Sequence, residues 1–125
     1  MTQRFVGLVL AASLVTLPAP AANAANPRHD LTVSAKEIGG DSNRFKMYGA
    51  VPTAAGVELR VQRKVNKGAF EDWGIELTAA ETGRFSFKIY GGKRGSTICY
   101  RVVVPAGDGH RTTKGKKWCI ETEAG

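Results

Sequence analysis

The chain has 125 residues and a formal net charge of +7, so it has room for one domain with a surplus of positive charge. A zinc site would need closer cysteine spacing or more ligands than Cys99, Cys119, His29 and His110 offer, and we therefore expect no metal and no cofactor. The charge would attract an anionic partner without selecting it. No stretch beyond the N-terminus is long and apolar enough to cross a membrane.

Residues 1–24 have the features of a cleaved signal peptide. An arginine near the start precedes the apolar run Phe5–Leu17, and Ala22-Asn23-Ala24 fits a cleavage site of the A-x-A type. The alternative is a membrane anchor, but the run is shorter than the roughly 18 to 20 residues that a spanning helix needs. We expect cleavage after Ala24, or alternatively after Ala21 or Ala25, and hence an extracellular protein with a net charge of about +6.

Residues 25–30 form a polar leader that we expect to be flexible, and residues 31–125 form the folded domain. Along seven segments apolar and polar residues alternate, as in half-buried β-strands, and glycine, proline and asparagine turns separate them. The seven predicted strands are Leu31–Ala35, Arg44–Val51, Val57–Val65, Asp72–Thr78, Arg84–Tyr90, Thr97–Ala106 and Lys116–Thr122. This pattern predicts an all-β, antiparallel, two-sheet β-sandwich, with a small closed β-barrel as the alternative.

The segment Thr97–Ala106 is the most strand-like, and we expect it to be the central strand. Because its alternate residues Tyr100 and Val102 would face the core, Cys99 would face outward, and Cys119 would do the same in the last strand. These two strands are predicted to be antiparallel neighbours, so a disulfide can join them on the outer face. Closing a loop of about 20 residues contributes on the order of 3 kcal/mol in the chain-entropy model.

Five segments resemble the bacterial immunoglobulin-like and fibronectin type III-like modules of secreted and surface proteins. They are Tyr48-Gly49-Ala50-Val51, Gly56–Arg63, Trp73, Glu81–Phe87 and Tyr100–Ala106. The resemblance implies a seven-stranded immunoglobulin-like β-sandwich that serves as a non-catalytic module. The second strand holds no cysteine, so the predicted disulfide differs from the inter-sheet bridge of antibody domains.

We expect no enzymatic activity, because no arrangement typical of a catalytic site stands out. Glu71 and Asp72 are adjacent in a strand and would point to opposite faces. His110 lies near Asp108 without a nucleophile motif, so it is predicted to be a solvated loop residue. A hydrolase is the alternative, and it would need a pocket of converging polar groups.

Two sets of residues are candidates for binding a partner. The first set is the loop cations Lys93, Arg94, Arg111, Lys114, Lys116 and Lys117. The second is Tyr48 and Tyr90, which would face outward and, if their strands are neighbours, would form an aromatic and basic surface with Lys46 and Lys88. The alternatives are a solubilising charge and ordinary β-propensity. Both tryptophans share a face with aliphatic residues, which predicts a place in the core.

The leading hypothesis is a secreted, non-catalytic immunoglobulin-like module that contacts an extracellular or cell-surface partner. The alternative is a small cationic effector or inhibitor that acts through the loop Gly107–Gly115. An anionic cell-wall polymer, a polysaccharide and another protein all remain open as partners, because the charge attracts without selecting. We expect no sequence-specific nucleic-acid binding and no transmembrane segment after processing.

Overall fold

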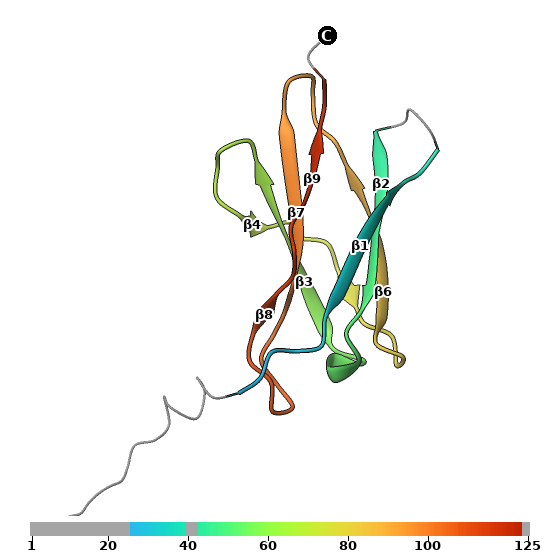
Figure 1. The fold of residues 1–125 in the computed structure, drawn as a ribbon, viewed down its shortest axis with the longest axis vertical. Helices are drawn as coiled ribbons and strands as arrows, with labels where there is room; N and C mark the ends of the chain where they lie inside the picture. The colour runs from blue at the N-terminus through green and yellow to red at the C-terminus, as the bar shows by residue number, and fades with distance from the viewer. Residues whose placement is uncertain (1–25, 40–42, 124–125) are drawn as a thin grey trace, which may run out of the picture.

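The computed structural model describes residues 26–39 and 43–123, and the predicted signal peptide, residues 1–24, lies outside this range. The strands are β1 (Thr32–Glu37), β2 (Arg44–Ala50), β3 (Glu58–Val65), β4 (Glu71–Asp72), β5 (Leu77–Thr78), β6 (Arg84–Tyr90), β7 (Thr97–Val104), β8 (Thr113–Lys114) and β9 (Trp118–Glu121). They form two antiparallel sheets, which lie as two layers (Figure 1). No strand of one sheet pairs with the other in the described ranges, so the β-sandwich is confirmed over the closed barrel.

The smaller sheet has the order β1-β2-β6, with β2 in the middle. The strands of Tyr48 and Tyr90 are neighbours, which was the condition for a shared surface, since β2 and β6 pair along their full length. Gly49 lies on the inner side of β2, where a Cβ would collide with the carbonyl oxygen of Thr32 in β1. Only glycine lets β1 approach this closely.

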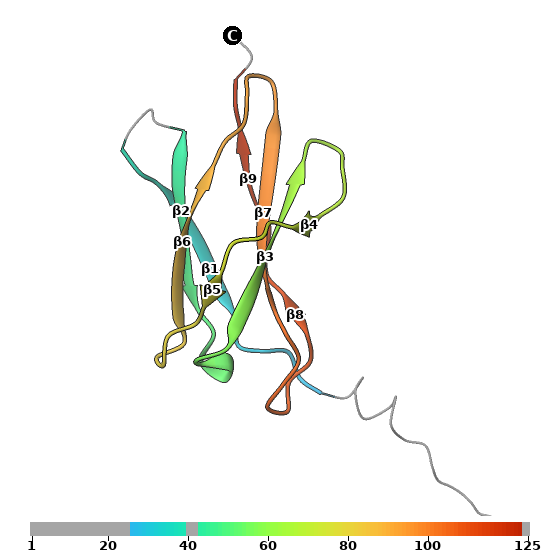
Figure 2. The same ribbon diagram turned by 180° about the vertical axis from the view of Figure 1, so that it is seen from behind.

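The larger sheet contains β4-β3-β7-β8, with β5 paired to β3 and β9 paired to β7. Figure 2 shows β3 and β9 on either side of β7. The expectation that Thr97–Ala106 supplies the central strand is therefore confirmed. Most of β7 is buried, including alternate residues on its outer side such as Val103, and paired strands border both of its edges.

One predicted strand is wrong. Asp72–Thr78 is not continuous, since only its ends pair with β3, as β4 and β5. Gly74 between them has a φ of +81°, a left-handed conformation that interrupts a strand. The loop Gly107–Gly115 also contains a short strand that was not predicted, β8, which pairs with Val103 and Val104.

The core fills the space between the sheets. Its fully buried members include Met47, Leu59, Ile89 and Tyr100. Trp73 packs edge-on against Tyr100 with 5.0 Å between ring centroids, and Trp118 packs against the same cluster. Both tryptophans therefore contribute to the core, as the sequence predicts. The described residues form one 3-10 turn, η2 (Pro52–Ala54), and include no helix that is long and apolar enough to cross a membrane.

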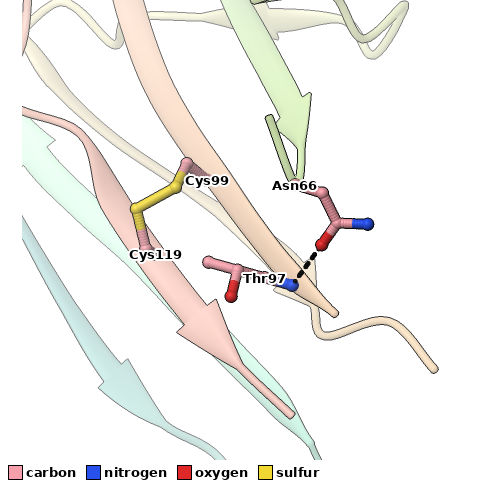
Figure 3. The surroundings of a disulfide bond; sticks show 4 residues. All are labelled: Asn66, Thr97, Cys99 and Cys119. Atoms are coloured by element: carbon pink, nitrogen blue, oxygen red, sulfur yellow. Dashed lines mark hydrogen bonds between the residues drawn. A yellow bond between two sulfur atoms is a disulfide. The ribbon is translucent and has the colours of Figure 1, made fainter. Parts of the chain in front are cut away.

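The predicted disulfide joins Cys99 of β7 to Cys119 of β9 (Figure 3). The two residues are direct partners in the register, with their Cα atoms 3.9 Å apart. Both lie on the outer side of the larger sheet, yet Cys99 is only 4% exposed because it sits in the central strand. Nearby, the Thr97 amide donates to Oδ1 of Asn66, which ties the start of β7 to the turn after β3.

Candidate functional site

The outer side of the β1-β2-β6 sheet combines two exposed tyrosines with a row of lysines. We call it the small-sheet face and define it by the outward residues Thr32, Ser34, Lys36, Arg44, Lys46, Tyr48, Arg84, Ser86, Lys88 and Tyr90. Three large hydrophobic side chains are exposed in the described ranges, and two of them, Tyr48 and Tyr90, lie here at 39% and 44% exposure. Exposed aromatic rings are common in surfaces that bind ligands, which makes this face a candidate.

Tyr48 lies in the central strand with a serine on each side. The strand register places Ser34 of β1 and Ser86 of β6 directly beside it. These small side chains leave the aromatic ring open to solvent and add two hydroxyl groups at the same level. The Lys36 ammonium lies over this ring, with its Nζ atom 5.8 Å from the ring centroid.

A row of three lysines crosses the sheet next to Tyr48. Lys36, Lys46 and Lys88 are direct partners in the register of β1, β2 and β6. Adjacent strands are about 4.8 Å apart, so the row spans roughly 10 Å between the outer Cα atoms. In the described part of the chain none of the three forms a salt bridge. Three like charges therefore stand side by side without a carboxylate between them.

Tyr90 lies beyond the lysine row, opposite Arg44 in the register. Its backbone is held from inside the sandwich, because the buried Tyr100 hydroxyl donates to the Tyr90 carbonyl oxygen at 2.7 Å. This hydrogen bond runs from β7 of the larger sheet to the end of β6 in the smaller one. It fixes the point from which the Tyr90 side chain projects.

The small-sheet face is hollowed over part of its length. A concavity of about 780 Å³ is lined by polar side chains of all three strands together with Tyr48, and it reaches Thr78 beyond the edge of β6. This volume falls in the range of small-molecule sites, although the hollow is open to solvent. The arrangement can hold an extended ligand against an aromatic ring, between hydroxyl groups and ammonium groups.

The outer side of the larger sheet also carries cations, but they have partners. We call this surface the large-sheet face and define it by Arg60, Gln62, Lys64, Phe70, Asp72 and Arg101. Arg101 donates from Nε to Gln62 at 2.8 Å and stacks on Phe70 with 4.0 Å to the ring centroid. Arg60 forms a salt bridge of 3.5 Å with Asp72. The cations of this surface are thus held by neighbouring residues.

The loop cations predicted to bind a partner are all exposed, but they do not form one site. Lys93 and Arg94 precede β7, whereas Arg111 and Lys114 follow it. The eight residues of β7 separate the two groups by roughly 25 Å. Lys116 and Lys117 lie between β8 and β9, and the Lys116 ammonium lies 5.3 Å from the Trp118 ring centroid.

A histidine pair ties the leader to the loop after β7. His29 is 5% exposed, and its ring stacks on His110 with 4.8 Å between centroids. Its Nε2 atom lies 2.9 Å from the Pro105 carbonyl and its Nδ1 atom 2.8 Å from the Thr53 hydroxyl. The predicted flexible leader thus makes specific contacts at this point. The contacts of His29 could not be predicted from the sequence, because its partners Thr53 and Pro105 lie 24 and 76 positions away.

Lys36, Ser34 and Ser86 are members of the small-sheet face that sequence reasoning missed. Lys36 follows the end of the predicted first strand, and the alternation of Thr32 and Ser34 would have placed it outward. Its position beside Lys46 depends on the register of β1 against β2. In residues 26–39 and 43–123, no group of three or more His, Cys, Asp or Glu side chains is arranged to hold a metal ion.

Comparisons with known proteins give a fold but not a family. No protein-family model and no curated protein matches the chain, so membership in the immunoglobulin-like or fibronectin type III-like families is not confirmed. Among solved structures, the chain is similar to a carbohydrate-binding module, described as the Br derivative of BhCBM56. The two share 18% sequence identity over 75% of this chain and 94% of that chain, with a TM-score of 0.50. This likeness is one of fold, an all-β sandwich.

Proposed function

We propose that this protein is an extracellular, non-catalytic module that binds a polysaccharide on its small-sheet face. The observation that carries the proposal is Tyr48, an exposed aromatic ring in the middle strand with a serine on each side. The similarity in fold to a carbohydrate-binding module supports it. Of the partner classes that the sequence leaves open, we therefore propose a polysaccharide.

The chemistry of a sugar ring suits this surface. A pyranose has an apolar face of C–H groups, which packs against an aromatic ring, and a rim of hydroxyl groups, which needs hydrogen-bond partners. Tyr48 offers the ring, while the hydroxyls of Ser34 and Ser86 lie at the same level of the sheet. Because all three project from paired strands, little conformational entropy is lost when a ligand binds.

The disulfide supports an extracellular location. Disulfides persist in oxidising compartments and are rare in reducing ones. The Cys99–Cys119 bridge joins the two cysteines of the chain, and residues 1–24 have the composition of an export signal. Export would bring the protein to the polysaccharides that surround cells.

The small-sheet face fits this function better than the loop Gly107–Gly115, which the effector hypothesis requires. The loop is tightly turned, because Gly107 and His110 exchange two backbone hydrogen bonds around Asp108 and Gly109. Its backbone is further held by Pro27, whose carbonyl accepts from the Arg111 amide at 2.9 Å. The loop offers exposed charge but no open aromatic ring.

The test is the binding of the purified protein to an array of neutral and acidic glycans, with two matched variants. Tyr48→Ala removes the proposed platform, whereas Val65→Ala removes another exposed hydrophobic side chain, 44% exposed, from the larger sheet. We expect Tyr48→Ala to weaken binding by about 10-fold or more, as for a central aromatic contact. Val65→Ala should bind like the unaltered protein. The proposal fails if no glycan binds, or if the two variants bind equally well.

A further inference from the structure

We infer that the polysaccharide bound by the small-sheet face is an acidic one, and that the row Lys36–Lys46–Lys88 binds its carboxylate or sulfate groups. This inference rests on the proposed function and adds the chemical class of the ligand. The three lysines are direct register partners across β1, β2 and β6. Like charges directly opposite one another on neighbouring strands destabilise a sheet. A bound anion would offset the repulsion between the three ammonium groups.

The lysine row has fewer internal partners than the cations of the large-sheet face. Elsewhere Arg60 pairs with Asp72, while Arg101 and Lys64 lie over Phe70. In the described ranges the lysines of the row make no salt bridge, and only Lys36 has a ring contact, to Tyr48. The ammonium groups are therefore free to donate hydrogen bonds to an external anion.

The position of the row matches a sugar that is stacked on Tyr48. Lys46 lies two residues before Tyr48 in β2, so the row is about 7 Å from the tyrosine along the strand. Tyr90 and Arg44 lie one further step away in the same direction. A polysaccharide that runs along β2 would pass the ring of Tyr48 and then the lysine row, before it reaches Tyr90. Acidic groups on successive sugars would meet the ammonium groups between the two tyrosines.

The lysine side chain also suits this class of ligand. An ammonium group is a compact charge on a flexible stem, and it binds carboxylate and sulfate without a fixed planar geometry. Single-stranded nucleic acid is a second class of polyanion that stacks on aromatic rings. We favour the glycan because the direct register neighbours of Tyr48 are two serines, whose hydroxyl groups suit the hydroxyl rim of a sugar. Nucleic acid is included as an outcome of the test.

The test uses pairs of polymers that differ in charge. Affinity gel electrophoresis would compare carboxymethyl cellulose with hydroxyethyl cellulose, and dextran sulfate with dextran. The row variant carries Lys36→Gln, Lys46→Gln and Lys88→Gln. Its matched control carries Lys67→Gln, Lys114→Gln and Lys117→Gln, three exposed lysines outside the small-sheet face. Both variants lose the same formal charge, so any effect of net charge alone is equal in the two.

We expect the unaltered protein to bind at least one charged polymer about 10-fold more tightly than its neutral counterpart. The row variant should lose most of that difference and much of its salt dependence, and the control should keep both. Preference for carboxymethyl cellulose would identify a carboxylate ligand, and preference for dextran sulfate a sulfate ligand. Equal losses in the two triple variants would overturn the inference, because binding would then follow net charge. Tighter binding of poly(dT) than of either charged glycan would overturn it in favour of nucleic acid.

The variant Tyr48→Ala separates this inference from the proposed function. If neutral glycans bind through Tyr48 while the row variant keeps its preference for charged polymers, the inference fails and the proposed function stands. If Tyr48→Ala binds every glycan like the unaltered protein, the proposed function fails and the inference fails with it. A thermal melt of the row variant should show no loss of stability, which establishes that a loss of binding is not a loss of folding.

Discussion

The two outer faces of the sandwich carry similar residue types and use them differently. On the large-sheet face, Arg60 and Arg101 are held by Asp72, Gln62 and Phe70. On the small-sheet face, three lysines stand in a row without a carboxylate, beside an exposed tyrosine. The number of cations therefore does not locate a binding surface in this protein. We propose instead that the binding surface is the sheet face whose cations lack a carboxylate partner.

The largest effect that we expect concerns the disulfide, which strengthens only one of the two sheets. The variant Cys99→Ala/Cys119→Ala should lose on the order of 3 kcal/mol of unfolding free energy, because it reopens a loop of 20 residues in the unfolded chain. Denaturant unfolding would measure this loss. Glycan affinity at a temperature where the variant is folded should not change, since the bridge lies on the larger sheet. A large drop in affinity would show that the faces are not independent.

The next largest effect concerns the close approach of β1 to β2. Gly49→Ala places a Cβ against the Thr32 carbonyl oxygen, so the strands must shift apart. We expect a loss of about 1–3 kcal/mol in unfolding free energy, as for other overpacked sites. Because the same shift moves Lys36 away from Lys46, binding should weaken as well. The matched substitution Gly107→Ala lies in open space and should leave both quantities unchanged.

A smaller effect concerns the hydrogen bond that joins the two sheets. Tyr100→Phe removes the hydroxyl that donates to the Tyr90 carbonyl and should cost about 1 kcal/mol of unfolding free energy. If this bond positions Tyr90, the variant should also lose the part of the affinity that Tyr90→Ala loses. A double-mutant cycle of the two substitutions measures that coupling. Additive losses would show that the bond supports stability alone.

The smallest effects should have opposite signs on the two faces. Lys46→Gln removes like-charge repulsion and should stabilise the protein by a few tenths of a kcal/mol. Asp72→Asn breaks the exposed salt bridge to Arg60 and should destabilise it by up to about 0.5 kcal/mol. Thermal unfolding at low and high salt would show both changes shrinking as charges are screened. If both substitutions changed the stability in the same direction, the proposed difference between the two faces would be wrong.

Much of the fold could be predicted from the sequence because alternation is a local signal. The inward side of β2 and β6 and the outward direction of Cys99 and Cys119 follow from a period of two along each strand. The break at Gly74 could not be predicted, since Trp73, Ile75 and Leu77 keep the same period across it. Periodicity reports which residues share a side, and it does not report whether the backbone stays extended.

The candidate site was predictable only in part, because it depends on register. Tyr48 and Tyr90 could be placed outward on neighbouring strands, together with Lys46 and Lys88. Lys36 joins them only because β1 pairs with β2 so that Lys36 faces Lys46. A shift of one residue would have turned Lys36 toward the core. Register is set by packing across the sheet, so it could not be predicted from the local pattern of a single sequence.

The placement of the disulfide has a mechanical consequence. If a long polymer is held on the small-sheet face, a pull on that polymer acts first on β1, β2 and β6. The load reaches the rest of the domain through core packing, the Tyr100–Tyr90 hydrogen bond and the backbone segments that join the sheets, such as residues 91–96, whereas the disulfide connects β7 to β9 in the other layer. The bridge therefore lies off the load path. Under tension we expect the non-covalent contacts between the layers to yield first, so the disulfide protects the larger sheet and not the contact between the layers.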